Sequence, residues 1–152
     1  PLEPNLSYPT SKAAASIAFM GMCRDLNIKL RMLRFFHVFG EGEPSTRFWP
    51  SLKKAALAGD DFDMSAGAQI RDFVNVDHVA KVLTKALDFS SIKGGEPVVS
   101  HVATGKPKSL MDFANEQWKI LNASGKLNAG GVSLRRNEIN QIISNPSDIF
   151  QI

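Results

Sequence analysis

A tyrosine and a lysine one helical turn apart are the residues of this chain best suited to chemistry. They stand in the run Tyr8-Pro9-Thr10-Ser11-Lys12, and a helical pattern continues through the alanine-rich residues 13–20. Side chains four positions apart lie on the same face of a helix. An ammonium group beside a phenol favours the phenolate, so Tyr8 could exchange a proton near neutral pH. The alternative interpretation is an ordinary surface turn with an extended lysine.

The elements that must position this pair alternate between helices and strands. Helices are predicted where apolar residues recur at helical spacing, over 7–26, 48–58, 77–87 and 109–121, with Asn27, Gly59, Asp77 and Ser109 as stop or cap residues. Strands are predicted over 28–36, 62–65, 70–76, 98–103, 132–134 and 139–143, and loops over 40–44 and 125–131. The alternation indicates an α/β chain with a largely parallel sheet, and the later short strands indicate a smaller appended lobe.

Composition and length fit one ordinary globular domain. The chain has 152 residues, of which 43% are hydrophobic and 22% charged, with a net charge of +3. The basic residues are scattered, which argues against a nucleic-acid partner and is compatible with an anionic ligand such as a phosphate ester. The sequence has no apolar run of membrane-spanning length, and its single cysteine, Cys23, excludes an internal disulfide, so we expect a cytoplasmic protein.

Both ends of the chain suggest that it is a piece of a longer protein. It begins with Pro1 rather than methionine, and it stops just after Ser147, which is placed to begin another helix. We therefore expect truncation at both ends.

Several stretches resemble ligand-binding motifs but lack residues that those motifs require. Gly40 and Gly42 follow a predicted strand, yet the third glycine of a dinucleotide-binding turn is absent. The same kind of gap excludes a P-loop at 105–106 and a calcium loop at 60–63. No metal site is expected, because no metal-like spacing relates the three histidines, His37, His78 and His101.

Three further stretches stand in order after the tyrosine and lysine. They are Arg34-Phe35-Phe36-His37-Val38-Phe39-Gly40, then Gln69-Ile70-Arg71-Asp72-Phe73-Val74-Asn75-Val76-Asp77-His78-Val79-Ala80, and finally Arg135-Arg136-Asn137-Glu138. In this order and spacing, the four motifs resemble the extended short-chain dehydrogenase/reductase family. More narrowly, they are similar to its NAD-dependent nucleotide-sugar epimerases, dehydratases and 4-ketoreductases. The resemblance covers nearly the whole chain and is thin between residues 125 and 132.

The resemblance implies that residues 1–152 are the C-terminal half of such an enzyme. They would form the last strands and helices of a Rossmann-like doubly wound parallel sheet, interleaved with a small α/β substrate-binding lobe. The glycine-rich turn for NAD or NADP and the third catalytic Ser or Thr would lie upstream of Pro1, so the fragment alone should be inactive. Family members also lead us to expect a homodimer formed through the helix of Tyr8 and Lys12.

The same resemblance implies roles in catalysis and cofactor binding. Tyr8 would exchange a proton with a sugar hydroxyl while hydride passes to or from NAD or NADP. Lys12 would hold the nicotinamide ribose and favour the tyrosinate form. Phe35, Phe36 and Val38 would form the strand end that flanks the nicotinamide.

A nucleotide-diphosphate sugar is the implied substrate. Members of the family usually have asparagine where His37 stands, and that asparagine bonds the substrate, so altered specificity is expected; the alternative is a buried histidine with satisfied hydrogen bonds. Arg71 matches an arginine that grips the diphosphate, the alternative being a salt bridge with Asp72. The other matches are the diphosphate loop, the base pocket and a closing pair: Arg47 and Phe48, Phe62 and Met64, and Arg135 and Glu138. Phe62 and Met64 could equally be ordinary core residues.

Two other functions stay open. A reductase of the same fold that acts on a non-nucleotide ketone, such as a steroid or flavonoid, would leave Arg71 and Arg135 without an anionic partner. A non-catalytic, NAD(P)-binding regulatory relative would have no need to keep both Tyr8 and Lys12. The sequence does not decide between nucleotides, between sugars, or between epimerase, dehydratase and reductase.

Overall fold

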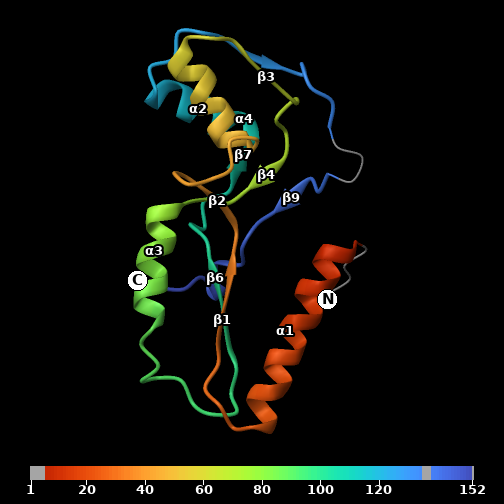
Figure 1. The fold of residues 1–152 in the computed structure, drawn as a ribbon, viewed down its shortest axis with the longest axis vertical. Helices are drawn as coiled ribbons and strands as arrows, with labels where there is room; N and C mark the ends of the chain where they lie inside the picture. The colour runs from red at the N-terminus through yellow and green to blue at the C-terminus, as the bar shows by residue number, and fades with distance from the viewer. Residues whose placement is uncertain (1–5, 135–137, 152) are drawn as a thin grey trace.

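The computed structural model describes residues 6–134 and 138–151 (Figure 1). In chain order the elements are α1 (Ser7–Asp25), β1 (Arg31–Phe35), β2 (His37–Phe39), α2 (Phe48–Ala58), β3 (Phe62–Met64), β4 (Ile70–Arg71), β5 (Phe73–Asn75), α3 (Val76–Ala86), β6 (Val98–Val102), β7 (Lys108–Ser109), α4 (Leu110–Ile120), β8 (Leu127–Ala129), β9 (Gln141–Ile142) and the 3-10 turn η1 (Pro146–Asp148). The predicted α/β class is confirmed, and most strand pairs are parallel.

One extended segment runs through β1 and β2 and changes its pairing partner part-way. β1 pairs in parallel with β6, and β2 pairs in parallel with β5. The change falls between two consecutive residues. The Phe36 amide donates to the Val102 carbonyl at 3.1 Å, and the His37 amide donates to the Asp72 carbonyl at 3.0 Å. Ligands of open α/β sheets bind where neighbouring strands diverge in this way.

The core of the lower half in Figure 1 lies between α3 and these strands. Val79 and Val82 of α3 pack with Val74 and Val102, and each of these four side chains is almost fully buried. Figure 1 shows α3 on one side of the β1–β6 pair and α1 on the other. Within residues 6–134 and 138–151, no helix has both the length and the apolar character that crossing a membrane requires.

A second core lies in the upper half of Figure 1, between α2, α4 and β3. Leu52, Met64 and Ala114 form its buried centre. Phe62 packs against this centre, with its ring 5.8 Å from that of Phe48. For Phe62, the alternative of an ordinary core residue is therefore the one that the packing favours.

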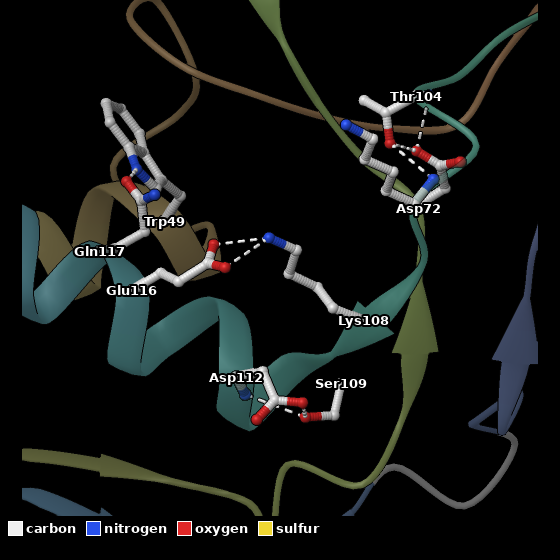
Figure 2. A network of polar contacts seen from close by, with 9 residues as sticks. Trp49, Asp72, Thr104, Lys108, Ser109, Asp112, Glu116 and Gln117 are labelled. Carbon is white, nitrogen blue, oxygen red and sulfur yellow. Dashed lines mark hydrogen bonds and ion pairs between the residues drawn. The ribbon is translucent and has the colours of Figure 1, made fainter.

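Local cap chemistry sets the ends of the helices in this lobe. Gly59 ends α2 in the left-handed conformation, at φ 74°. Ser109 begins α4, and its hydroxyl accepts the amide of Asp112 at 2.9 Å (Figure 2).

The prediction of Asp77 as the cap of α3 is wrong. Asn75 is the cap, because its side-chain oxygen reaches the Asp77 amide at 2.8 Å.

Four strand and helix predictions also differ from the structure. The predicted strand 70–76 is two strands, because β4 pairs with β7 and β9 whereas β5 pairs with β2. Residues 132–134 form no strand, and β8 occupies the stretch predicted as a loop, because it pairs with β3. The helix expected from Ser147 is the single turn η1, capped by Asn145.

Candidate active site

The tyrosine and the lysine lie on one face of α1, as their spacing predicts. The Lys12 ammonium is 5.6 Å from the centroid of the Tyr8 ring. Tyr8 is 71% exposed, and Cys23 is the buried residue of the helix. The phenol and the ammonium are thus presented together on an open surface of α1.

A pocket of about 460 Å³ lies at the carboxyl end of the β1–β2 segment, between the two cores. This volume falls in the range of small-molecule sites. Eight residues proposed from the sequence line it: Phe36, His37, Val38, Arg47, Phe48, Met64, Arg71 and Glu138. Four others do not: Tyr8, Lys12, Phe35 and Phe62. Arg135 lies outside the described residues.

Arg71 is a buried cation that holds the segment 138–140. One guanidinium nitrogen donates to the Glu138 carboxylate at 2.6 Å and to the Ile139 carbonyl at 2.7 Å. The other donates to the carbonyls of Ile70 at 2.8 Å and Asn140 at 3.4 Å. Arg71 is 7% exposed. The guanidinium group of Arg71 therefore links β4 to the residues just before β9 and holds Glu138 at the pocket wall.

Asp72 turns to a different set of partners. Its carboxylate accepts the hydroxyl and amide of Thr104 at 2.6 Å and 2.8 Å (Figure 2). It also accepts the Gly105 amide at 2.8 Å and the Ser144 hydroxyl at 3.4 Å. Side chains of consecutive residues in extended backbone point to opposite faces. The alternative of an Arg71–Asp72 salt bridge is accordingly wrong.

Two titratable groups on the pocket wall have shifted pKa values. Partial desolvation lowers the pKa of His37, and the positive charges of Arg71 and Arg47 lower it further, while Glu138 opposes them. Desolvation raises the pKa of Glu43, opposed by Arg47 and by a hydrogen bond from the Gly40 backbone. The His37 side chain is exposed and its ring meets Phe73 edge-on at 5.1 Å, so the alternative of a buried histidine is wrong.

The first turn of α2 adds positive potential to the same wall. Arg47 is the N-cap residue of α2, and its side chain makes no cap hydrogen bond. Thr46, Arg47 and Phe48 all line the pocket. The amides at a helix N-terminus favour an anion, and here the guanidinium of Arg47 stands beside them. The wall is therefore suited to a phosphate group.

Part of what a nicotinamide cofactor needs is present in this chain. Tyr8 and Lys12 offer an exposed phenol and ammonium on one helix face, and Phe36 and Val38 line the strand end at the pocket. The glycine turn for the pyrophosphate is absent from residues 1–152 by sequence. These side chains are of the types that suit the nicotinamide and ribose end of such a group, although Tyr8 and Lys12 do not line the pocket with Phe36 and Val38.

Sequence reasoning missed several pocket residues. Glu43 comes from the loop before α2, and Ser65 and Gln69 come from the segment between β3 and β4. Gln69 did stand in the recognised motif, two residues before Arg71, and this position in the motif was an available signal. Glu43 and Ser65 had no comparable signal.

Comparison with known proteins decides the family. Residues 1–99 match the family model of the NAD dependent epimerase/dehydratase family, which is more than half of the chain. The chain belongs to this family. The expectation from the sequence motifs is thereby confirmed.

Named relatives agree with this family. The chain is 31% identical over 120 residues to the CDP-abequose synthase of Salmonella muenchen, a match that covers 79% of the chain and 40% of the relative. It is 26% identical over 138 residues to the UDP-glucose 4-epimerase of Rhizobium meliloti (strain 1021), covering 80% and 41%. The chain thus spans about two fifths of the length of these two family members.

The fold agrees as well. The structure of the UDP-N-acetylglucosamine 4-epimerase from Methanobrevibacter ruminantium M1 in complex with UDP-N-acetylmuramic acid superposes with a TM-score of 0.79 at 22% identity. The match covers 95% of this chain and 46% of that one. The chain therefore has the Rossmann-like α/β fold expected from the sequence.

Proposed function

We propose that residues 1–152 are the C-terminal, substrate-binding half of an NAD(P)-dependent nucleotide-sugar epimerase, dehydratase or 4-ketoreductase. The observation that carries the proposal is the pocket, which is lined by eight residues chosen from sequence motifs, two of them arginines. The names of the two relatives support a nucleotide sugar, since one is a CDP-abequose synthase and the other a UDP-glucose 4-epimerase.

The diphosphate of the substrate lies against the wall of Arg47 and the first turn of α2. Arg47 is exposed there and has no cap hydrogen bond to break, so it is free to pair with an anion. Arg71 contributes from a buried position behind Arg47 and the first turn of α2. It adds positive potential and fixes Glu138, which closes over the ligand together with Arg135 in the neighbouring segment.

Tyr8 carries the proton transfer. Its exposed hydroxyl gives a proton to, or takes one from, a substrate oxygen, and the Lys12 ammonium on the same face stabilises the phenolate. A nicotinamide cofactor, when bound, supplies the hydride acceptor and donor. Phe36 and Val38 form an apolar strand end beside the reacting groups, which excludes water from them.

The whole protein is proposed to be a cytoplasmic homodimer that forms through α1. This helix exposes large apolar side chains at Ile17, Phe19 and Met22, at 57%, 54% and 48%. Exposed apolar stretches of this kind mark interaction surfaces. The buried free thiol of Cys23 is in keeping with a reducing compartment.

Calorimetric titration of the full-length protein tests the pocket. UDP and CDP should bind, and uridine and cytidine should bind at least about tenfold more weakly, since they lack the anion that Arg47 pairs with. Arg47→Ala should remove that difference. Arg24→Ala, which deletes an exposed arginine of α1, should leave it unchanged. Equal binding of nucleotides and nucleosides by the wild type would refute the diphosphate site and favour a reductase of non-nucleotide ketones.

A further inference from the structure

Unsatisfied hydrogen-bond acceptors gather in the pocket. Within residues 6–134 and 138–151, four buried side-chain nitrogen or oxygen atoms have no hydrogen-bond partner: Arg31 Nε, Glu43 Oε2, Gln69 Oε1 and His101 Nδ1. Two of the four, Glu43 and Gln69, line the same pocket. Leaving a buried acceptor without a donor costs about 1–3 kcal/mol. Because both residues line one cavity, a ligand bound there is the candidate source of the missing donors.

Gln69 is held firmly in place. Its side chain and backbone together are only 8% exposed, and its carbonyl accepts the Leu110 amide at 2.9 Å. Its amide nitrogen donates to the Ser65 hydroxyl at 3.3 Å. The nitrogen is therefore engaged inside the protein, and the oxygen is the atom left for a ligand.

Glu43 stands in a pocket wall that carries charges of both signs, since Arg47 and Arg71 line it together with Asp63 and Glu138. It is half-buried in the loop before α2. Its amide donates to the Gly40 carbonyl at 3.4 Å, which ties the loop back on itself. The four ion pairs found in the described part of the chain join Lys53 to Glu41, Arg71 to Glu138, Lys93 to Glu96 and Lys108 to Glu116. Glu43 is in none of them.

We propose that Glu43 and Gln69 accept hydrogen bonds from hydroxyl groups of the ligand and thereby select polyhydroxylated ligands. The proposal rests on the proposed function, because it assumes a nucleotide sugar in this pocket. A hydroxyl group can donate to either acceptor without bringing a further charge into a lining where Arg47 and Arg71 already stand with Asp63 and Glu138. The hydroxyls of the hexose and those of the ribose have the same chemistry, and the experiment separates them.

Removing a single acceptor should weaken ligand binding strongly. A site built to bond a hydroxyl discriminates strongly against a ligand without it, because the buried protein group is then left unpaired. Gln69→Leu and Glu43→Leu each remove an acceptor, so each should weaken binding of the hydroxylated ligand about tenfold or more. Gln69→Glu and Glu43→Gln keep an acceptor oxygen and should retain most of the affinity.

The experiment is calorimetry on the full-length protein with three probes, namely UDP-glucose, UDP and 2′,3′-dideoxy-UDP, repeated with the cytidine series. A loss confined to the glucose conjugate supports contact with hexose hydroxyls. A loss for the conjugate and for UDP, but not for 2′,3′-dideoxy-UDP, supports contact with ribose hydroxyls. Gln151→Leu and Glu96→Leu, which alter exposed residues outside the pocket, are the matched controls.

Other outcomes overturn the inference. Equal weakening of all three probes would mean a purely structural role, and unchanged affinities would mean that neither side chain meets the ligand. Thermal unfolding monitors each variant, and Gln69→Asn and Glu43→Asp, which shorten the side chain, replace a leucine variant that does not fold. A wild-type protein that binds no nucleotide would refute the proposed function itself, and this inference with it.

Discussion

Arg71 and Asp72 adjoin in the chain and fasten different segments to the junction between β4 and β5. Arg71 bonds the backbone and carboxylate of residues 138–140, whereas Asp72 bonds the turn at Thr104 and Gly105. Both side chains are buried. Arg71 sets the position of Glu138 on the pocket wall, whereas Asp72 sets the turn after β6, whose residues Thr104 and Gly105 do not line the pocket.

Replacing Arg71 should affect both stability and binding. Arg71→Ala leaves Glu138 and three carbonyls without their donor, so we expect a loss of about 3 kcal/mol in the free energy of unfolding. Urea denaturation of the full-length protein measures it. Where the variant folds, KM for a nucleotide sugar should rise far more than the Kd for NAD. Glu138→Gln keeps an acceptor for Arg71 and should cost less stability. Equal effects on sugar nucleotide and NAD would contradict the assignment of Arg71 to the substrate side.

Asp72 should matter for folding alone. In Asp72→Asn, an NH2 group replaces one carboxylate oxygen. The remaining oxygen cannot accept the hydrogen bonds of both Thr104 and Gly105. We expect the free energy of unfolding to fall by about 2 kcal/mol. Chemical denaturation checks this, with the exposed Asp25→Asn as a control of the same chemistry. An Asp72→Asn protein as stable as the wild type would show that the hydrogen bonds of this carboxylate contribute little.

Tyr8 should matter for turnover alone. The phenol is exposed, so Tyr8→Phe should leave the thermal midpoint of the full-length enzyme unchanged. Loss of the proton-transfer group should lower kcat about 10²- to 10⁴-fold, with NAD affinity largely retained. Lys12→Met should also lower kcat, and Arg24→Met on the same helix should not. Full activity in Tyr8→Phe would remove the catalytic assignment.

The pKa of His37 gives a prediction about pH. Desolvation and the charges of Arg71 and Arg47 hold it below its ordinary value of 6.5. The unfolded chain therefore takes up a proton at this residue before the folded protein does, so stability present above pH 6.5 is lost as pH falls through the folded pKa. Unfolding free energies measured from pH 5 to 7.5 should show a weaker pH dependence in His37→Asn. NMR titration should also show this pKa rising when UDP binds, and a fall would contradict the anion site.

Local signals carried most of the helix predictions. Residues 48–58 form a helix as predicted, because Gly59 stops it through its own backbone freedom, and Ser109 caps α4 with its own hydroxyl. The ends of the strands could not be predicted from the sequence in this way. The break at Asp72 exists because β4 and β5 pair with different partners, and β8 exists because β3 lies beside it. Such pairings join residues far apart in the chain and leave no local pattern.

The pocket residues divide in the same way, into those with a local sequence signal and those without one. Arg71, His37 and Glu138 were found because they stand in motifs, whereas Glu43 and Ser65 reach the wall only through the fold. The catalytic pair is the opposite case. Tyr8 and Lys12 are the clearest signal in the sequence, yet they lie on α1, outside the residues that line the pocket.

The shared segment of β1 and β2 limits how this protein can evolve. Because Phe36 is bonded to Val102 and His37 to Asp72, inserting or deleting one residue between Arg31 and Phe36 would shift the register of β1 against β6 and turn its side chains to the opposite face of the sheet. A change in length is therefore costly in this segment, whereas a point substitution leaves the strand pairing intact. The loop at 40–46 has no strand partners to keep in step, and it is where a change in length can be accepted.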